Sequence, residues 1–280
     1  MKKLTGRKFG IEIEMLVPQQ YTGRNVADIL MAEGIPCIYA GYTHEVLNNC
    51  WKVVTDCSIK PEESIKTVNF KGYELVSPPL SGKDGVNQLK AVCAVLDTIG
   101  ATVNKSCGLH IHHEIVDYTL DSWKTLTKAY LKFEDEIDNF MPVSRKGNAN
   151  LYCLNFSDVN SLSGLNLKAK FDLIDSKSTV SDLLEVFTDT YRARYRKLNV
   201  TSYAVYGTIE FRHHSGTVEF EKIVNWLLLT QGLVERGARA KKVVAKRPNQ
   251  DKWFESLMYT AEVEASVVKF YTGRKALLAS

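Results

Sequence analysis

Hydrophobic and polar residues alternate with a period of two in several stretches of the chain. The first such stretch places Phe9, Ile11 and Ile13 on one side and Glu12 and Glu14 on the other. Because alternate residues of a strand point to opposite faces, this pattern predicts a strand with one face in the core. The same alternation recurs near residues 110 and 210.

Further elements follow from periodicity and from the turn residues between the periodic segments. Strands are predicted at 9–16, 50–55, 72–76, 109–115 and, for most of its length, 203–214. Helices are predicted at 24–33, 83–99, 121–140, once or twice within 165–187, at 219–236 and over most of 252–275. Asp121 is the expected N-cap of the helix at 121–140. Residues 147–164 are rich in Asn, Ser and Gly and predict a long loop, a kind of segment that often carries function.

Composition places the chain among ordinary globular proteins. It has 280 residues, of which 45% are hydrophobic and 24% are charged, and this length is enough to bury a sizeable core. A net charge of +4 is too small to indicate a particular partner. The sequence has neither the GxGxxG nor the GxxxxGK[ST] loop, which argues against Rossmann and P-loop proteins.

Cysteine usage and hydropathy predict a cytoplasmic protein without a membrane span. None of the six cysteines forms a CxxC pair, so a zinc ribbon is not indicated, and scattered cysteines are typical of reduced thiols. The first ten residues have no apolar segment of the kind found in secretory signals. No uncharged apolar run approaches the roughly 18–20 residues that a membrane helix needs.

Three of the predicted strands carry ionisable residues two positions apart. These are Glu12 with Glu14, His110 with His112, and Glu210 with Arg212 and His214. Residues at i and i+2 of a strand share a face, so each group forms a concentrated polar surface. Any one of them alone is compatible with a solvated sheet face. Asp56 and Glu74, near the ends of two other strands, are each compatible with an ordinary structural role.

The three groups together predict a metal site. Carboxylates that are brought together raise one another's energy unless cations share the site. Carboxylate oxygens with imidazole suit Mg²⁺ or Mn²⁺, whereas Zn²⁺ more often recruits cysteine or a tight set of three ligands.

Several short motifs, in this order, resemble those of the amidoligase family, which is similar to glutamine synthetase and glutamate–cysteine ligase in its catalytic core. They are GIEIE at 10–14, DCSI at 56–59, YELVSPPL at 73–80, CGLHIHH at 107–113, LN at 198–199 and TIEFRHHSGT at 208–217 followed by NW at 225–226. The motifs span about three quarters of the chain, and their order makes the resemblance specific. Residues after about Arg236 match nothing in the family pattern.

The resemblance implies an α+β fold with a curved, mainly antiparallel β-sheet backed by helices and a catalytic core like that of glutamine synthetase. It implies one catalytic domain over residues 1–280, with a helical C-terminal part at about 219–280. The implied cofactors are ATP, bound at one end of the sheet, and two or more Mg²⁺ ions between ATP and a carboxylate substrate, with Mn²⁺ as an alternative.

The resemblance also implies roles for individual residues. The implied metal ligands are Glu12, Glu14, Glu74, His112 and Glu210. The implied catalytic residues are Arg212, which would hold the transferring phosphate, Glu210 and His110. The implied nucleotide-binding residues are Arg212, Asn199, His112 and Ser58, and Asp56 is a further candidate.

The assignment of the two histidines stays open, because either His110 or His112 matches the metal or phosphate histidine of the family. Cys57 departs from the pattern, since the family often has glycine in this turn. By strand alternation His213 faces the helices and is expected to be structural, and His113, opposite His112, is expected to be structural or peripheral.

The implied function is an ATP-dependent carboxylate–amine ligase that forms an amide through an acyl phosphate. A metal-dependent hydrolase could use the same carboxylates and histidines without ATP, and a non-catalytic binding module on this fold would bind no metal. The donor and acceptor are left open among small-molecule, peptide or protein carboxylates and amines and a modified nucleobase. An oligomer is compatible with the sequence.

Overall fold

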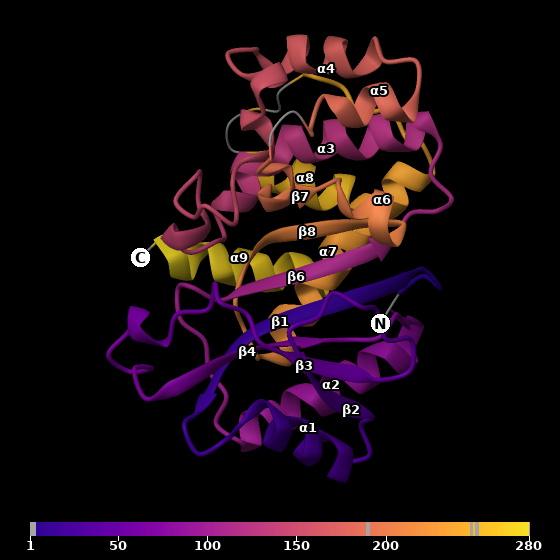
Figure 1. The fold of residues 1–280 in the computed structure, drawn as a ribbon. Helices are drawn as coiled ribbons and strands as arrows, with labels where there is room; N and C mark the ends of the chain where they lie inside the picture. The colour runs from indigo at the N-terminus through magenta and orange to yellow at the C-terminus, as the bar shows by residue number, and fades with distance from the viewer. Residues whose placement is uncertain (1–3, 189–190, 247–248, 250–251, 280) are drawn as a thin grey trace. The chain divides into compact units, whose positions relative to one another are not determined.

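The computed structural model describes residues 4–188, 191–246, 249 and 252–279, which form a mixed α+β fold with an open, mostly antiparallel sheet (Figure 1). The strands are β1 (Lys8–Pro18), β2 (Cys37–Gly41), β3 (Trp51–Val54), β4 (Phe70–Val76), β5 (Leu80–Ser81), β6 (Gly108–Glu114), β7 (Leu198–Asn199) and β8 (Thr208–Ser215). The α-helices are α1 (Gly23–Ala32), α2 (Gly82–Thr98), α3 (Leu120–Asp138), α4 (Leu167–Asp175), α5 (Val180–Glu185), α6 (Ser202–Tyr206), α7 (Phe220–Ala238), α8 (Trp253–Thr260) and α9 (Ala265–Ala279). The predicted α+β class is therefore confirmed.

The chain divides into two compact units. The first unit comprises residues 1–112 and 214–226, and the second comprises residues 113–213 and 227–280. Each unit has fully buried large side chains of its own, such as Trp51 in the first unit and Tyr130 in the second. None of the described helices, within 4–188, 191–246 and 252–279, has both the length and the apolar character needed to cross a lipid bilayer.

In the first unit, β1 pairs in antiparallel fashion with β4 and, at its first two residues, with β5. On the far side of β4, β3 pairs antiparallel with β4 and parallel with β2. The apolar side chains of β1, Phe9, Ile11 and Ile13, are buried as the alternation predicts. Helix α1 packs on β2 and β3, α2 packs on β5, and the two helices contact each other (Figure 1).

Two of the motif residues, Ser77 and Gly216, have structural roles in the first unit. Ser77 extends the pairing of β4 with β1, because its hydroxyl accepts the Ile11 N–H at 2.8 Å and its own N–H donates to the Ile11 carbonyl at 2.9 Å. Gly216 donates its N–H to the Cys107 carbonyl at 2.8 Å, and a Cβ at this position would lie 2.5 Å from the Cys107 Cβ. Close packing therefore explains the glycine.

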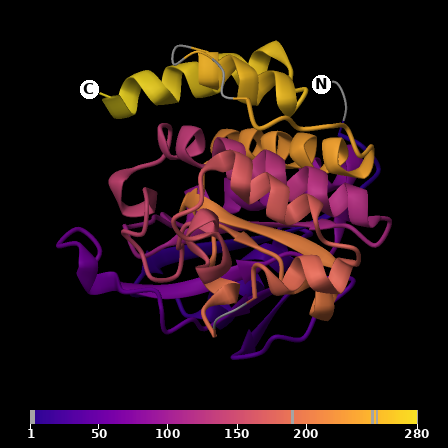
Figure 2. The ribbon, with the colours of Figure 1, turned by 90° about the horizontal axis from the view of Figure 1, so that it is seen from above.

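In the second unit, β7 and β8 form an antiparallel pair, and α3 contacts α4, α5 and α8. Figure 2 shows α8 and α9, in yellow, lying over the layer that contains α3. The expected N-cap of α3 at Asp121 is wrong. Thr119 caps the helix, because its hydroxyl accepts the Ser122 N–H at 3.3 Å, and Asp121 lies in the first turn.

The prediction of a strand over most of 203–214 needs correction at its beginning. Residues 202–206 form the short helix α6, and β8 starts only at Thr208. Gly207, with a φ of 65°, ends the helix in the left-handed conformation that glycine tolerates. The β-branched and aromatic residues of this segment favour a strand, but local hydrogen bonds override that preference, among them the bond from the Ser202 hydroxyl to the Thr208 carbonyl at 2.7 Å.

The remaining predicted elements agree with the structure to within a few residues. The segment 165–187 contains two helices, α4 and α5. The predicted loop at 147–164 is a loop interrupted by two short 3₁₀ turns, Phe156–Asp158 and Asn160–Leu162. The short strands β2, β5 and β7 were not predicted from the residue pattern.

Candidate active site

Three carboxylates gather on one face of the first unit's sheet. Glu12 and Glu14 lie on β1, and Glu74 lies on β4. The antiparallel register places Glu14 directly opposite Glu74, and Glu14 is only 5% exposed. Like charges at directly opposed positions of a sheet are destabilising, so this register disfavours the fold unless positive charge is nearby.

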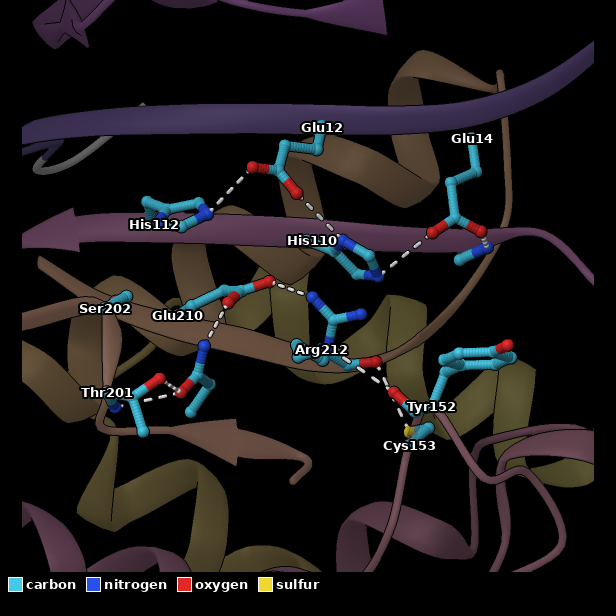
Figure 3. Close-up of polar contacts among 12 residues, drawn as sticks. Glu12, Glu14, His110, His112, Tyr152, Cys153, Thr201, Ser202, Glu210 and Arg212 are labelled. Atoms are coloured by element: carbon cyan, nitrogen blue, oxygen red, sulfur yellow. Dashed lines mark hydrogen bonds and ion pairs between the residues drawn. The ribbon is translucent and has the colours of Figure 1, made fainter. Parts of the chain in front are cut away.

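Two histidines of β6 face the carboxylates of β1, Glu12 and Glu14 (Figure 3). His110 lies with Nδ1 2.9 Å from Glu12 Oε2 and with Nε2 3.4 Å from Glu14 Oε1. His112 Nε2 lies 3.1 Å from the other oxygen of Glu12. His110 therefore has a carboxylate oxygen near each ring nitrogen, and Glu12 has a histidine near each of its oxygens.

The carboxylates have opposite titration behaviour. Burial, together with the charges of Glu12, Glu14 and Asp56, raises the pKa of Glu74 well above its ordinary value. Burial also opposes ionisation of Glu12, but His112 and His110 outweigh it and bring the pKa of Glu12 well below its ordinary value. The site thus contains one stabilised anion and one carboxyl group that resists ionisation, as expected where acids share too little positive charge.

A compact set of ligand atoms lies within this group. Glu12, Glu74 and His110 each offer one oxygen or nitrogen atom, and these atoms all lie within 4.8 Å of one another. Two carboxylates and an imidazole form a donor set that suits Mn²⁺ and, with water completing the shell, Mg²⁺. Glu14 is engaged differently, since its Oε2 accepts the Gly108 N–H at 2.6 Å. The residues fit a divalent cation.

The Asp56-Cys57-Ser58 segment forms a tight turn next to these acids. The Asp56 carboxylate accepts the Ser58 N–H at 2.7 Å, and its charge contributes to the raised pKa of Glu74. In the described backbone the only non-glycine residues with positive φ are Ala240 and Glu262, so the turn does not require glycine at Cys57. The turn therefore tolerates this departure from the family pattern.

The second unit holds the other group of predicted residues, Asn199, Glu210 and Arg212. Asn199 lies opposite Glu210 in the β7–β8 pair, and its amide donates to Glu210 Oε2 at 2.6 Å. The Arg212 guanidinium donates to the other oxygen, Oε1, at 2.5 Å (Figure 3). Asn199 is itself oriented by Thr201, whose N–H and hydroxyl both donate to its side-chain oxygen. Glu210 is thus an ion-paired, nearly buried carboxylate.

Residues of the predicted loop also contact Arg212, and nothing in the sequence indicates these contacts. Arg212 Nε donates to the Tyr152 carbonyl at 3.4 Å, and the Cys153 thiol lies 3.4 Å from the Arg212 carbonyl. The loop at 147–164 was identified from its composition, but composition does not show which backbone carbonyl faces a guanidinium.

The predictions for the alternate histidines are confirmed. His113 and His213 are fully buried, with His113 Nε2 2.8 Å from the Thr230 hydroxyl on α7 and His213 Nδ1 2.8 Å from the Tyr130 hydroxyl on α3. His214, which the alternation placed on the ionisable face, is also fully buried, with its ring 5.5 Å from that of Trp226.

A buried polar network supports β8 and was not predicted. Lys197 is fully buried, and its ammonium donates to Asp138 Oδ1 and to the Asn155 side chain, each at 2.6 Å. His213 Nε2 lies 2.5 Å from the same Asp138 oxygen. Burial and Lys197 lower the pKa of His213 to about 4, against the opposing effect of Asp138. Burial opposes ionisation of Asp138, but His213 and Lys197 outweigh it and lower its pKa to about 2.

Comparison with known proteins identifies one family. The sequence pattern of the family described as "Putative amidoligase enzyme" matches residues 5–234, which covers most of the chain. No curated protein matches the sequence. Among solved structures, the chain is similar to a bifunctional glutathione synthetase from Pasteurella multocida, with 12% sequence identity and a TM-score of 0.49. That alignment covers 98% of this chain and 47% of the other, so this chain spans about half the length of that protein.

Proposed function

The chain belongs to the amidoligase family, and on this premise we propose that it is an ATP- and Mg²⁺-dependent ligase that joins a carboxylate to an amine. The observation that carries the proposal is the opposition of Glu14 and Glu74 beside Glu12 and His110. Carboxylates this close to one another are stabilised when divalent cations bind between them. ATP is a common substrate that binds to proteins together with such cations on its phosphates.

The proposed reaction has two steps. A carboxylate oxygen of the donor attacks the γ-phosphorus of ATP, the bond to ADP breaks, and an acyl phosphate forms. The amine nitrogen of the acceptor then attacks the acyl carbon, phosphate leaves, and the nitrogen loses a proton to give the amide. The difficulty of the first step is electrostatic, because an anionic carboxylate must approach an anionic phosphate.

The acidic face of the first unit would hold the metal. Glu12, Glu74 and His110 form the compact donor set of this face, and Glu14 and His112 are the further proposed ligands there. Glu210, which belongs to the second unit, is proposed as a metal ligand on the family resemblance alone. When bound, divalent ions neutralise phosphate charge and align the reacting groups. We propose that one of these two histidines, His110 and His112, contacts the metal and that the other contacts phosphate.

Arg212 is proposed to hold the transferring phosphate. Its guanidinium can present two parallel N–H groups to an oxyanion, which a lysine cannot do. Glu210 fixes one edge of the guanidinium and Asn199 fixes Glu210, so the arginine is oriented before a ligand arrives. Asn199, His112 and Ser58 are the further proposed contacts to the nucleotide.

The proposal also covers the catalytic core, the domain organisation, the cellular location and the substrates. We propose a catalytic core like that of glutamine synthetase, a single catalytic domain over 1–280, and a cytoplasmic location. The donor and acceptor are proposed to be small molecules, peptides or proteins, or a modified nucleobase.

The test is an assay for ADP and amide with ATP, Mg²⁺ and pools of carboxylates and amines. We expect ADP and amide in equal amounts, and only when all four components are present. Arg212→Lys keeps the charge but loses the fork, so we expect it to be slowed by about 100-fold or more. Turnover without ATP would support a hydrolase, whereas a chain that binds neither ATP nor Mg²⁺ in calorimetry would be a binding module.

A further inference from the structure

A group of exposed and half-buried tyrosines and arginines lies on the second unit. The Tyr152 and Tyr195 rings meet edge to face with their centroids 5.3 Å apart, and the Arg194 guanidinium lies 5.4 Å from the centre of the Tyr195 ring. We call these three residues the stacking platform. Tyr152 is 46% exposed, although a tyrosine ring of this size gains from burial. A second pair follows the same pattern, with the Arg192 guanidinium 5.2 Å from the centre of the exposed Tyr191 ring.

The backbone beneath the platform is fixed by hydrogen bonds. Leu154 donates its N–H to the Tyr195 carbonyl at 2.8 Å, and Lys197 donates its N–H to the Leu154 carbonyl at 2.8 Å. These bonds tie the loop that carries Tyr152 to the segment that carries Tyr195. The two rings are therefore held by backbone pairing as well as by their own contact.

The buried network described above anchors the same loop from below. The Lys197 ammonium binds Asn155, and Asp138 accepts both the Lys197 ammonium and the Gly147 N–H, the latter at 2.8 Å. Asp138 and Lys197 thus hold the loop on both sides of Tyr152. Burying a lysine completely is unfavourable unless its hydrogen-bond partners are well placed. The network of Lys197, Asp138 and Asn155 meets this condition, and it holds in place the loop that carries the exposed Tyr152 ring.

The platform adjoins the arginine that we assign to phosphate. Arg212 Nε donates to the Tyr152 carbonyl, while another nitrogen of the same guanidinium binds Glu210 (Figure 3). A ligand whose phosphate binds Arg212 would therefore lie next to Tyr152, the residue that carries the exposed ring.

We propose that the stacking platform binds a nucleobase, with the base against the exposed Tyr152 ring and phosphate toward Arg212. A tyrosine face beside arginine is the combination that binds bases, since every base has a planar π-face and the cations attract its phosphates. The inference rests on the proposed function for the phosphate role of Arg212. The base has two sources, ATP itself or a nucleotide-containing substrate.

The first arm of the test compares ATP with inorganic tripolyphosphate, both with Mg²⁺, by calorimetry on the full chain. For Tyr152→Ala we expect ATP binding to weaken by about 10-fold or more while tripolyphosphate binding is unchanged. Tyr152→Phe, which keeps the ring, should bind ATP like the unaltered protein. Tyr259→Ala is the control, because Tyr259 is an 81% exposed tyrosine on α8 outside the platform.

The second arm separates the two sources by measuring nucleoside monophosphates and a short single-stranded oligonucleotide at saturating ATP. If Tyr152→Ala weakens these ligands by about 10-fold but leaves ATP unchanged, the base belongs to a substrate. Either pattern supports the platform. Binding of every base-containing ligand equal to that of the unaltered protein in a folded Tyr152→Ala would overturn it. Failure of the unaltered protein to bind ATP or tripolyphosphate would instead overturn the proposed function, and base binding that depends on Tyr152 would still be measurable with nucleosides.

Discussion

The two units place carboxylates in contrasting surroundings. In the first unit Glu12, Glu14 and Glu74 lie close to one another, and the register of β1 and β4 forces two of them into opposition. In the second unit Glu210 has an oxygen for Asn199 and an oxygen for Arg212, so the protein itself satisfies the charge. Both groups are close to buried, yet only the first has a carboxyl group whose pKa is raised well above its ordinary value.

The contrast separates two ways of preparing a site for a polyanion. The first unit holds several carboxylates close together, and a cation from solution can neutralise them. The second unit holds the Arg212 guanidinium, whose orientation is fixed by the Glu210 carboxylate. A metal ion is thus expected to act on the stability of the first unit, while mild acid, between pH 7 and pH 5, is expected to destabilise chiefly the second.

The largest expected effect tests whether the two groups serve one reaction. Glu12→Gln and Glu210→Gln each remove a proposed ligand charge, so each should lower turnover by about 100-fold or more. If both residues act in the same step, the double variant should be little slower than either single variant. ADP release measures the rates, and thermal unfolding checks that each variant folds. Losses that multiply would show that the groups work independently.

A smaller effect is expected from acid on the buried network. His213 has a pKa of about 4 in the fold and an ordinary value of 6.5, so folding favours its neutral form. Its contribution to the free energy of unfolding is complete above pH 6.5 and is lost as the pH falls toward 4, which amounts to about 2 kcal/mol between pH 7 and pH 5. Urea unfolding at each pH measures it.

The matched variants for this measurement are His213→Gln and His44→Gln. The first should flatten the dependence of stability on pH in this range, and the second should leave it unchanged because His44 is exposed. Asp138, with a pKa of about 2, contributes only at still lower pH. A steep pH dependence that survives His213→Gln would contradict the assignment.

The smallest expected effect is a gain in stability. Because the pKa of Glu74 is raised, its ionised form opposes folding at neutral pH, and any stability it contributes is lost as the pH rises through the raised value. Glu74→Gln should therefore raise the free energy of unfolding by up to about 1 kcal/mol in the absence of metal. Mg²⁺ should stabilise the unaltered protein more than this variant. Glu62→Gln, at an exposed position, is the control, and a loss of stability in Glu74→Gln without metal would refute this account.

Strand periodicity was enough to predict the acidic face. The alternation around Glu12 fixes which residues of β1 enter the core, and the same rule correctly separated His112 from the buried His113. What the alternation could not give is register, because the pairing of Glu14 with Glu74 depends on where two distant strands meet. The resemblance to the family supplied Glu74 as a candidate, and the structure adds the partner that makes it electrostatically distinctive.

No comparable pattern of residues predicts the network around Lys197. A buried lysine is indistinguishable from an exposed one until its partners are known, and Asp138 and Asn155 are 59 and 42 residues away. The same holds for the N-cap of α3, where Asp121 and Thr119 are both acceptable capping residues and only the backbone conformation decides. Contacts between distant segments, and at the N-cap the local backbone conformation, account for what was missed.

The alternation along β1 has a consequence for how this protein could change over time. Inserting or deleting one residue before Ile11 would turn the strand over, exposing the isoleucines and driving the glutamates into the hydrocarbon interior. Selection for a stable fold therefore also preserves the direction in which the acids point. A substitution can remove one of these glutamates without disturbing the core. A shift of the strand by one residue cannot, because it would expose the apolar residues of β1.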